Sequence, residues 1–180
     1  MIIALAGRRV DAVDAQQQRF SPSRESIKMV RERIRALLQT QGATALVSSA
    51  ACGADLLALS EAGNLGLRRR IVLPFDREKF RATSVTDRPG DWGLLFDNVL
   101  NEVGSNGDLL IIQPNSEDKA YAEVNHTIVD EAISLGLELH QPAMTVLVWD
   151  GKSRGEGDLT EEFGAYARMR GVPVLDVMTL

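Results

Sequence analysis

Cysteine and histidine are scarce in this chain, which holds one cysteine and two histidines among its 180 residues. A single cysteine excludes an internal disulfide framework and a cysteine-rich zinc site, and it suits a reducing compartment. His126 and His140 do not have the spacing of metal ligands, so no metal site is expected. Cys52 has no histidine close in the sequence to act as its base, which favours a buried, unreactive thiol.

Positive charge and aromatic rings are also in short supply. The chain has 20 basic and 25 acidic residues, a net charge of -5 and 5% aromatic residues. Binding of a nucleic-acid strand needs a basic groove with aromatic rings on which the bases stack, so the composition argues against nucleic acid as a partner. There is no long apolar run, and Met1 leads into an apolar strand without a charged leader, which argues against a membrane span and a signal peptide. We therefore expect a cytoplasmic protein without a membrane partner.

Short apolar runs alternate with amphipathic stretches along the whole chain. The expected strands are 2–6, 45–48, 70–73, 109–113, 145–149 and 172–177. The expected helices begin at a Ser21-Pro22 cap, near residue 53, at an Asp91 cap, near 119 and near 159. This order predicts an α/β fold with a single doubly wound, mostly parallel Rossmann-like sheet and helices on both faces. No repeat or linker divides 1–180, so we expect one domain, in which the basic run 68–70 is a solvated loop.

The first, second and fifth expected strands end in small or glycine-rich loops. Carboxyl ends of parallel strands meet at one edge of a sheet, where open α/β proteins bind ligands. In the first loop, Gly7 is expected to allow close backbone approach. One of Arg8 and Arg9 is expected to face the ligand, because a guanidinium forks onto two phosphate or carboxylate oxygens. The alternative is that both arginines are solvated at the strand end.

The second loop, residues 46–55, reads LVSSAACGAD and opens a helix. The N-terminus of a helix attracts anions, and small residues let them approach the backbone. Ser48 and Ser49 are therefore candidate phosphate donors, with strand termination as the alternative. Gly53 is expected to serve tight packing, and Asp55 to serve the helix dipole or a ribose hydroxyl.

The third loop follows strand 145–149 and leads into the last helix. Its candidate ligand contacts are Asp150, Gly151, Gly155, Gly157 and Thr160. Asp150 is either a ribose or metal contact or a turn former. The alternative for the end of the loop is purely structural, because Asp158 can cap the last helix with Glu161 at the capping-box position.

One helix is expected to carry polar groups to the same edge. Tyr121, Asn125, Ile128 and Ala132 share one stripe of the helix near 119–135. In a right-handed crossover this helix begins beside the strand ends. Tyr121 and Asn125 are thus expected to face the ligand region, or alternatively to bond loop backbone, while the other two enter the core.

Taken together, these segments resemble a known superfamily. The strand ending in Gly7-Arg8-Arg9, the loop SSAACGAD with LPF at 73–75 downstream, and VWDG at 148–151 with its glycine-rich turn look like SLOG proteins. This Rossmann-type superfamily joins DprA-like and LOG-like proteins, and the resemblance covers nearly the whole chain. It implies a fold that binds nucleotides or nucleotide-derived ligands. Its members include phosphoribohydrolases, a DNA-uptake protein, cofactor carriers and nucleotide-sensing domains.

The chain departs from the hydrolases of that superfamily in one loop. LOG-like hydrolases carry a PGGxGTxxE-like loop that holds phosphate and supplies a catalytic glutamate. The nearest match, GEGDLTEE at 155–162, lacks the proline, displaces the threonine and adds Glu156 and Asp158. A carboxylate repels a phosphate unless a cation intervenes. Glu161 and Glu162 are accordingly candidate catalytic residues only if the chain is an enzyme.

The leading hypothesis is a sensor or carrier domain that binds a nucleotide or a nucleotide derivative at the carboxyl edge of the sheet. It requires no cofactor other than such a bound nucleotide. The alternative is a LOG-like N-glycosidic hydrolase acting on a nucleoside monophosphate, and the third is DprA-like binding of single-stranded DNA. The altered loop leans against an enzyme. The residues leave open whether the chain forms a homo-oligomer.

Overall fold

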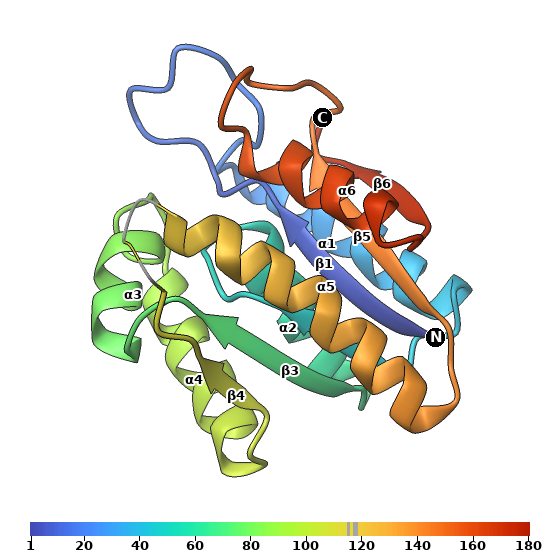
Figure 1. Ribbon diagram of the computed structural model, residues 1–180. Helices are drawn as coiled ribbons and strands as arrows, with labels where there is room; N and C mark the ends of the chain where they lie inside the picture. The colour runs from blue at the N-terminus through green and yellow to red at the C-terminus, as the bar shows by residue number, and fades with distance from the viewer. Residues whose placement is uncertain (115, 117–118) are drawn as a thin grey trace.

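The residues that the computed structural model describes, 1–114, 116 and 119–180, form a six-stranded sheet covered by helices on both faces (Figure 1). The strands are β1 (Ile2–Gly7), β2 (Ala45–Ser48), β3 (Arg68–Leu73), β4 (Leu109–Ile111), β5 (Ala143–Trp149) and β6 (Val174–Met178). Their order across the sheet is β4-β3-β2-β1-β5-β6, and every neighbouring pair is parallel. The predicted doubly wound α/β sheet is confirmed.

The helices divide between the two faces of the sheet. They are α1 (Arg24–Thr40), α2 (Ala54–Asn64), α3 (Arg77–Ser84), α4 (Trp92–Ser105), α5 (Ala120–Leu139) and α6 (Leu159–Met169). Side chains of α1 to α4 share one apolar core, and those of α5 and α6 share the other. This division follows from right-handed crossovers, because the chain moves outward from β1 to β4 and then in the opposite direction from β5 to β6.

The sequence pattern explains each helix through its apolar stripe and cap. In α1, Val30, Ile34 and Leu38 recur on one face and are buried. The cap of this helix is Ser23, whose Oγ accepts a hydrogen bond of 3.2 Å from the N–H of Ser26. The predicted Ser21-Pro22 cap was wrong by two residues, and the short helix α3 was not predicted at all.

The basic run 68–70 is not the solvated loop that the sequence predicted. It forms the first half of β3. Asp108 pairs with Arg68 at 2.9 Å and with Arg70 at 3.0 Å, and Arg69 pairs with Glu102 at 2.7 Å. Carboxylates from outside the run thus neutralise it, and a local charge pattern does not show them.

The order of the strands reverses between β1 and β5. The chain leaves β1 toward β2, and the later strand β5 pairs with the other side of β1, as the neighbouring blue and orange strands show (Figure 1). Such a switch point leaves a crevice outside the carboxyl ends of the two strands. The loops predicted as ligand loops follow β2, β1 and β5, three strands that are adjacent in the sheet.

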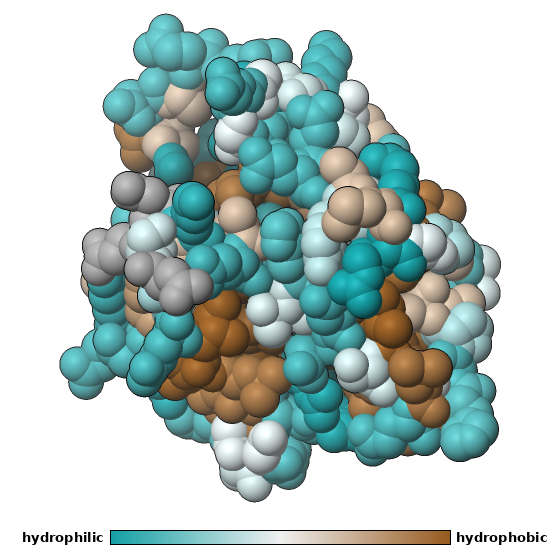
Figure 2. Space-filling view, viewed as in Figure 1, coloured by the Kyte–Doolittle hydropathy of each residue, from teal (hydrophilic) through white to brown (hydrophobic). Residues whose placement is uncertain are grey.

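The surface over α5 and α6 is largely hydrophilic (Figure 2). An apolar patch appears beside it near the edge strand β4, where Ile111 is 48% exposed. Among the described residues, no helix combines the length and the apolar character needed to cross a membrane.

Candidate functional site

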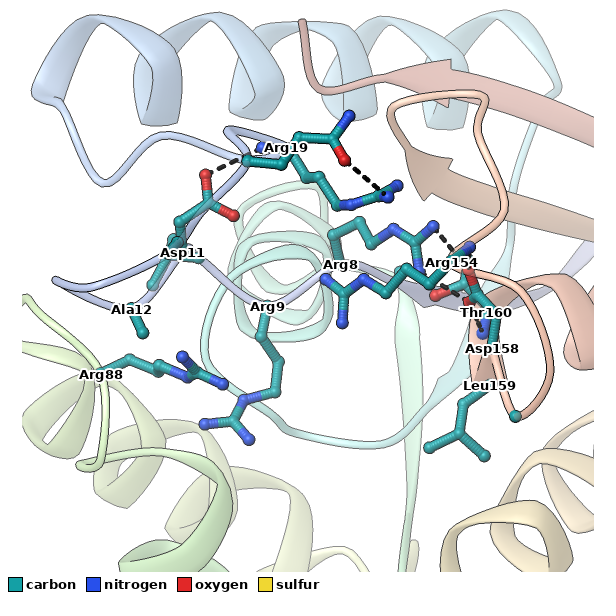
Figure 3. Close-up of a pocket in the computed structure, with 15 residues that line it drawn as sticks. Arg8, Arg9, Asp11, Ala12, Arg19, Arg88, Arg154, Asp158, Leu159 and Thr160 are labelled. Carbon is teal, nitrogen blue, oxygen red and sulfur yellow. Dashed lines mark hydrogen bonds and ion pairs between the residues drawn. The ribbon is translucent and has the colours of Figure 1, made fainter.

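A pocket of about 470 Å³ lies at the carboxyl ends of β1 and β5. Arginines enter it from the loop after β1, from the segment before α4 and from the loop before α6 (Figure 3). Among the described residues the charged side chains that line it are Arg8, Arg9, Asp11, Arg19, Arg88, Arg154 and Asp158. The predicted site residues Gly7, Gly157 and Thr160 line it as well.

The guanidinium of Arg8 binds carboxylates of the protein itself. Its Nη1 and Nη2 donate to the two oxygens of Asp158 at 2.6 and 2.8 Å, and its Nε donates to Asp150 at 3.2 Å. Nη2 also donates to the carbonyl of Lys152 at 2.7 Å. Burial by itself lowers the pKa of Arg8, but Asp158 and Asp150 outweigh burial and raise it. Arg8 therefore joins the end of β1 to the loop after β5.

Asp158 is the centre of this junction. It caps α6 by accepting from the N–H of Thr160 at 3.0 Å, and it accepts from the N–H of Arg154 at 2.7 Å. Burial pushes the pKa of Asp158 up, but Arg8 and the N–H of Arg154 bring it down to about 2. The structural alternative for Asp158 is thus what the structure shows. The capping box is not formed, because Glu161 pairs with the hydroxyl of Ser153.

Arg19 fastens the loop after β1 to the same junction. Its Nη1 donates to Asp150 and to the carbonyl of Lys152, each at 2.9 Å. Its backbone N–H donates to Asp11 at 2.9 Å. Asp150, which the sequence marked as a ribose or metal contact, is buried between Arg8 and Arg19 and lines neither pocket described here.

Arg9 and Arg88 share Asp87 on the opposite wall. Arg9 pairs with this carboxylate, and Arg88 lies 3.8 Å from it. Within the described residues, the Nε atoms of both arginines are buried without a hydrogen-bond partner. A buried N–H group of a cation is costly when it has no acceptor. Both side chains line the pocket, so each could contact an anion bound there.

Among the described residues, the Arg154 guanidinium has no carboxylate as an ion-pair partner. In the described part of the chain it makes no hydrogen bond or ion pair, although its side chain reaches the pocket (Figure 3). Burial and then the charges of Arg8 and Arg19 lower the pKa of Arg154. A neighbouring anion would relieve this repulsion between like charges.

A second pocket of about 390 Å³ adjoins the first. The two share Gly7, Arg9, Leu159 and Thr160. Besides the shared residues, four predicted ligand residues line the second pocket, namely Ser49, Asp55, Tyr121 and Asn125. Ile128 and Ala132 are buried in the core, so the stripe of α5 is oriented as the sequence predicted.

The two predicted glycines Gly7 and Gly53 serve packing. A Cβ on Gly7 would lie 2.4 Å from the carbonyl of Val148 and 2.6 Å from the Cβ of Ala54. Gly53 has a φ of 101°, and a Cβ there would lie 2.8 Å from the carbonyl of Arg8. The close approach at Gly53 is therefore between β1 and α2, and residues 8–10 separate Gly53 from the pockets.

Several other predicted residues line neither pocket. They are Ser48, Gly53, Asp150, Gly151, Gly155, Glu161 and Glu162. Ser48 is fully buried within β2, and Gly151 lies at a turn against Met178. Cys52 is buried, as predicted, and burial raises the pKa of its thiol.

Sequence reasoning missed Arg19, Arg88 and Phe80 as lining residues, and it did not include Arg154 among the ligand contacts. Arg19 and Arg88 lie in segments without a strand, helix or glycine pattern that would indicate a site. Phe80 lies on α3, the helix that the sequence did not predict. For Arg154 a signal existed, because it is the basic residue inside the glycine-rich turn.

No protein-family model matches the chain, and neither does any curated protein. Among solved structures, it is similar to the Moco carrier protein of Chlamydomonas reinhardtii, with 16% identity, a TM-score of 0.39, and 99% of this chain and 90% of the carrier covered. It is also similar to DprA of Streptococcus pneumoniae, with 13% identity, a TM-score of 0.41, and 96% of this chain and 57% of DprA covered.

A DprA protein is thus among the matches. The chain spans little more than half of that DprA chain, and likeness of this degree carries no function. Within the described residues, no group of three or more His, Cys, Asp or Glu side chains could hold a metal ion.

Proposed function

We propose that this protein binds a phosphorylated small molecule of the nucleotide type, with its phosphate in the pocket lined by Arg9, Arg88 and Arg154. The observation that carries this proposal is the Arg154 guanidinium, which lines the pocket and pairs with no side chain among the described residues. Guanidinium groups bind phosphate oxygens through paired, charge-assisted hydrogen bonds. Arg9 and Arg88 line the same space and add positive charge to it.

The position of the pocket supports the same proposal. It lies at the switch point between β1 and β5, where open α/β sheets bind ligands. Its volume of about 470 Å³, together with the adjoining pocket, falls in the range of sites for nucleotide-sized molecules. A bound nucleotide is the only cofactor-like group that this proposal needs.

We infer a role in binding, as a sensor or carrier, rather than in turnover. The two glutamates that a LOG-like hydrolase mechanism would use, Glu161 and Glu162, line neither pocket. Asp158 stands at the position where the hydrolase loop would hold phosphate, and both of its oxygens accept hydrogen bonds from Arg8. A hydrolase would need a carboxylate beside the anomeric carbon of the bound nucleotide.

Calorimetric titration with guanosine monophosphate, ribose 5-phosphate and guanosine tests the proposal. We expect the two phosphorylated compounds to bind and guanosine to bind at least about tenfold more weakly. Arg154→Gln should weaken both phosphorylated compounds by about tenfold or more, because it removes charge-assisted hydrogen bonds.

The matched control is Lys28→Gln, which removes one positive charge from an exposed pair with Glu32 on α1. This variant should bind as the parent does. Equal affinity for guanosine and guanosine monophosphate, or an Arg154→Gln variant that binds like the parent, would overturn the phosphate site.

A further inference from the structure

The second pocket continues from the phosphate pocket and has a different character. Its walls include the apolar side chains of Ala6, Ala51, Phe80 and Val124, in contrast to the arginines of the first pocket. Arg9 and Thr160 stand where the two pockets meet. If a phosphate occupies the first pocket, as proposed above, the second receives the part of the ligand that lies beyond the phosphate.

Most polar groups of this second pocket already have partners in the protein. The hydroxyls of Ser84 and Tyr121 lie 2.9 Å apart and share a hydrogen bond. The amide nitrogen of Asn125 donates to the carbonyl of Leu159 at 2.9 Å. These partners within the protein hold the three side chains in place along the wall of the pocket.

Asp55 adds a buried carboxylate to the wall of this pocket. It lies in the first turn of α2, is 6% exposed, and its Oδ2 accepts from the N–H of Ala51 at 3.2 Å. Its Oδ1 is buried and has no hydrogen-bond partner of good geometry among the described residues. A buried carboxylate oxygen without a donor is a rare and costly arrangement, and each such case calls for a reason.

The surroundings of Asp55 show what would complete it. Burial raises the pKa of Asp55 to about 7, although the N–H of Ala51, the charge of Arg9 and the N–H of Gly7 oppose the rise. Since no donor among the described residues makes a well-aligned hydrogen bond with Oδ1, an N–H group of a ligand in the pocket would meet an acceptor there. Arg9 already pairs with Asp87, so it is not the missing partner.

We propose that the second pocket holds a flat heterocycle whose adjacent ring N–H and amino group donate to Asp55. This donor pair is the 2-amino-4-oxopyrimidine edge that guanine and pterin rings share. A carboxylate accepts two parallel N–H donors well. Adenine presents a ring nitrogen with a lone pair beside its amino group, which the carboxylate would repel, and hypoxanthine has the ring N–H without the amino group. The phosphate end of the same molecule lies in the arginine pocket.

Titration of the whole chain with guanosine, inosine and adenosine monophosphates tests this inference. We expect guanosine monophosphate to bind about tenfold more tightly than inosine monophosphate, and adenosine monophosphate to bind most weakly, as is usual when a site built for a donor meets an analogue that lacks it. Asp55→Asn, nearly the same size, should reduce the preference for guanosine over adenosine monophosphate to less than about threefold. A phosphorylated pterin, used as a fourth probe, distinguishes the two sources of the shared edge.

The control is Thr83→Ala, which removes a side chain of the same pocket whose hydroxyl donates to the carbonyl of Lys79. This variant should keep the full preference. Equal affinities for the three nucleotides in the unmodified chain would overturn the inference whether or not Asp55→Asn folds. In that case ribose 5-phosphate still reports on the phosphate site, so the proposed function stands or falls by its own measurement.

Discussion

Arg8 and Asp158 meet through two hydrogen bonds of 2.6 and 2.8 Å although 150 residues separate them in the chain. Their side chains are 2% and 0% exposed. The pair fixes the loop after β5 against the end of β1, and with it the wall that carries Arg154. Arg8, one of the two arginines that the sequence offered as ligand contacts, is thus used within the protein, whereas the Arg154 guanidinium has no partner among the described residues.

Removing one partner of this pair should be costly. Arg8→Gln leaves the carboxylate of Asp158 buried without its cation and Asp150 with Arg19 alone, and breaking a buried pair in this way typically costs about 3–5 kcal/mol of unfolding free energy. Urea denaturation followed by circular dichroism measures the loss. Lys28→Gln, at an exposed ion pair, should change the same quantity by less than about 0.5 kcal/mol. Similar small losses in both variants would contradict a structural role for Arg8.

Acid should remove the contribution of ionised Asp158 to the free energy of unfolding. Its pKa in the folded protein is about 2, below the usual 3.8, so the ionised form favours folding above pH 4. That contribution, about 2 kcal/mol, is lost as the pH falls through the folded pKa. We expect the stability difference between the parent and Asp158→Asn to shrink by this amount between about pH 6 and pH 2. A difference that stays constant with pH would contradict the ionised pair.

Asp55 should act in the opposite sense. Its folded pKa of about 7 lies above the usual 3.8, so the folded chain holds a proton that the unfolded chain has lost. Stability therefore falls as the pH rises from about 4 to 7, by up to about 4 kcal/mol. In the absence of ligand, Asp55→Asn should be more stable than the parent at about pH 8 and should gain nothing near pH 4. Chemical denaturation at the two pH values checks this, and a variant that is less stable at both would contradict it.

Gly53 should tolerate a methyl group less well than Gly42. Both have positive φ, 101° and 57°, but a Cβ on Gly42 meets nothing within 4 Å. Gly42→Ala should cost about 1 kcal/mol from backbone strain. Gly53→Ala should cost about 2 kcal/mol more, because the new atom presses on the backbone of residues 8–10. Equal losses, measured by thermal unfolding, would show that this crowding can relax.

The glutamates of the last helix should be dispensable for binding. Glu161→Gln and Glu162→Gln should bind guanosine monophosphate within about twofold of the parent, since neither side chain lines a pocket. Chromatography of nucleoside monophosphates incubated with the parent protein should show no released base. Steady release that either substitution abolishes would make the protein an N-glycosidic hydrolase.

The fold could be predicted because its signals are local. Alternating apolar runs and amphipathic stretches indicate strands and helices wherever they occur, and right-handed crossovers then place the ends of β1, β2 and β5 side by side. Tyr121 and Asn125 followed from the same logic, because helical periodicity and the crossover together decide which end of α5 faces the pockets. The single domain and the ligand roles of these residues stay predictions.

The partners of each charge could not be predicted. Arg8 and Arg9 are adjacent and identical, and only the position of Asp158 on one side and Asp87 on the other distinguishes them. The run 68–70 was predicted to be solvated for the same reason, because Asp108, which pairs with it, is distant in the sequence. Long-range ion pairs leave no trace in a local pattern, so the sequence indicated where a site lies better than which side chains remain free in it.

The distance between Arg8 and Asp158 along the chain also bears on how the protein is made. Synthesis proceeds from the N-terminus, so β1 emerges with its guanidinium long before the residues that neutralise it. Until the C-terminal turn arrives, burying Arg8 would leave a charge without its counterion. The wall of the ligand pocket around Arg8 can therefore form only after the residues that follow β5 have been synthesised. A chain that ends before α6 should lack this wall.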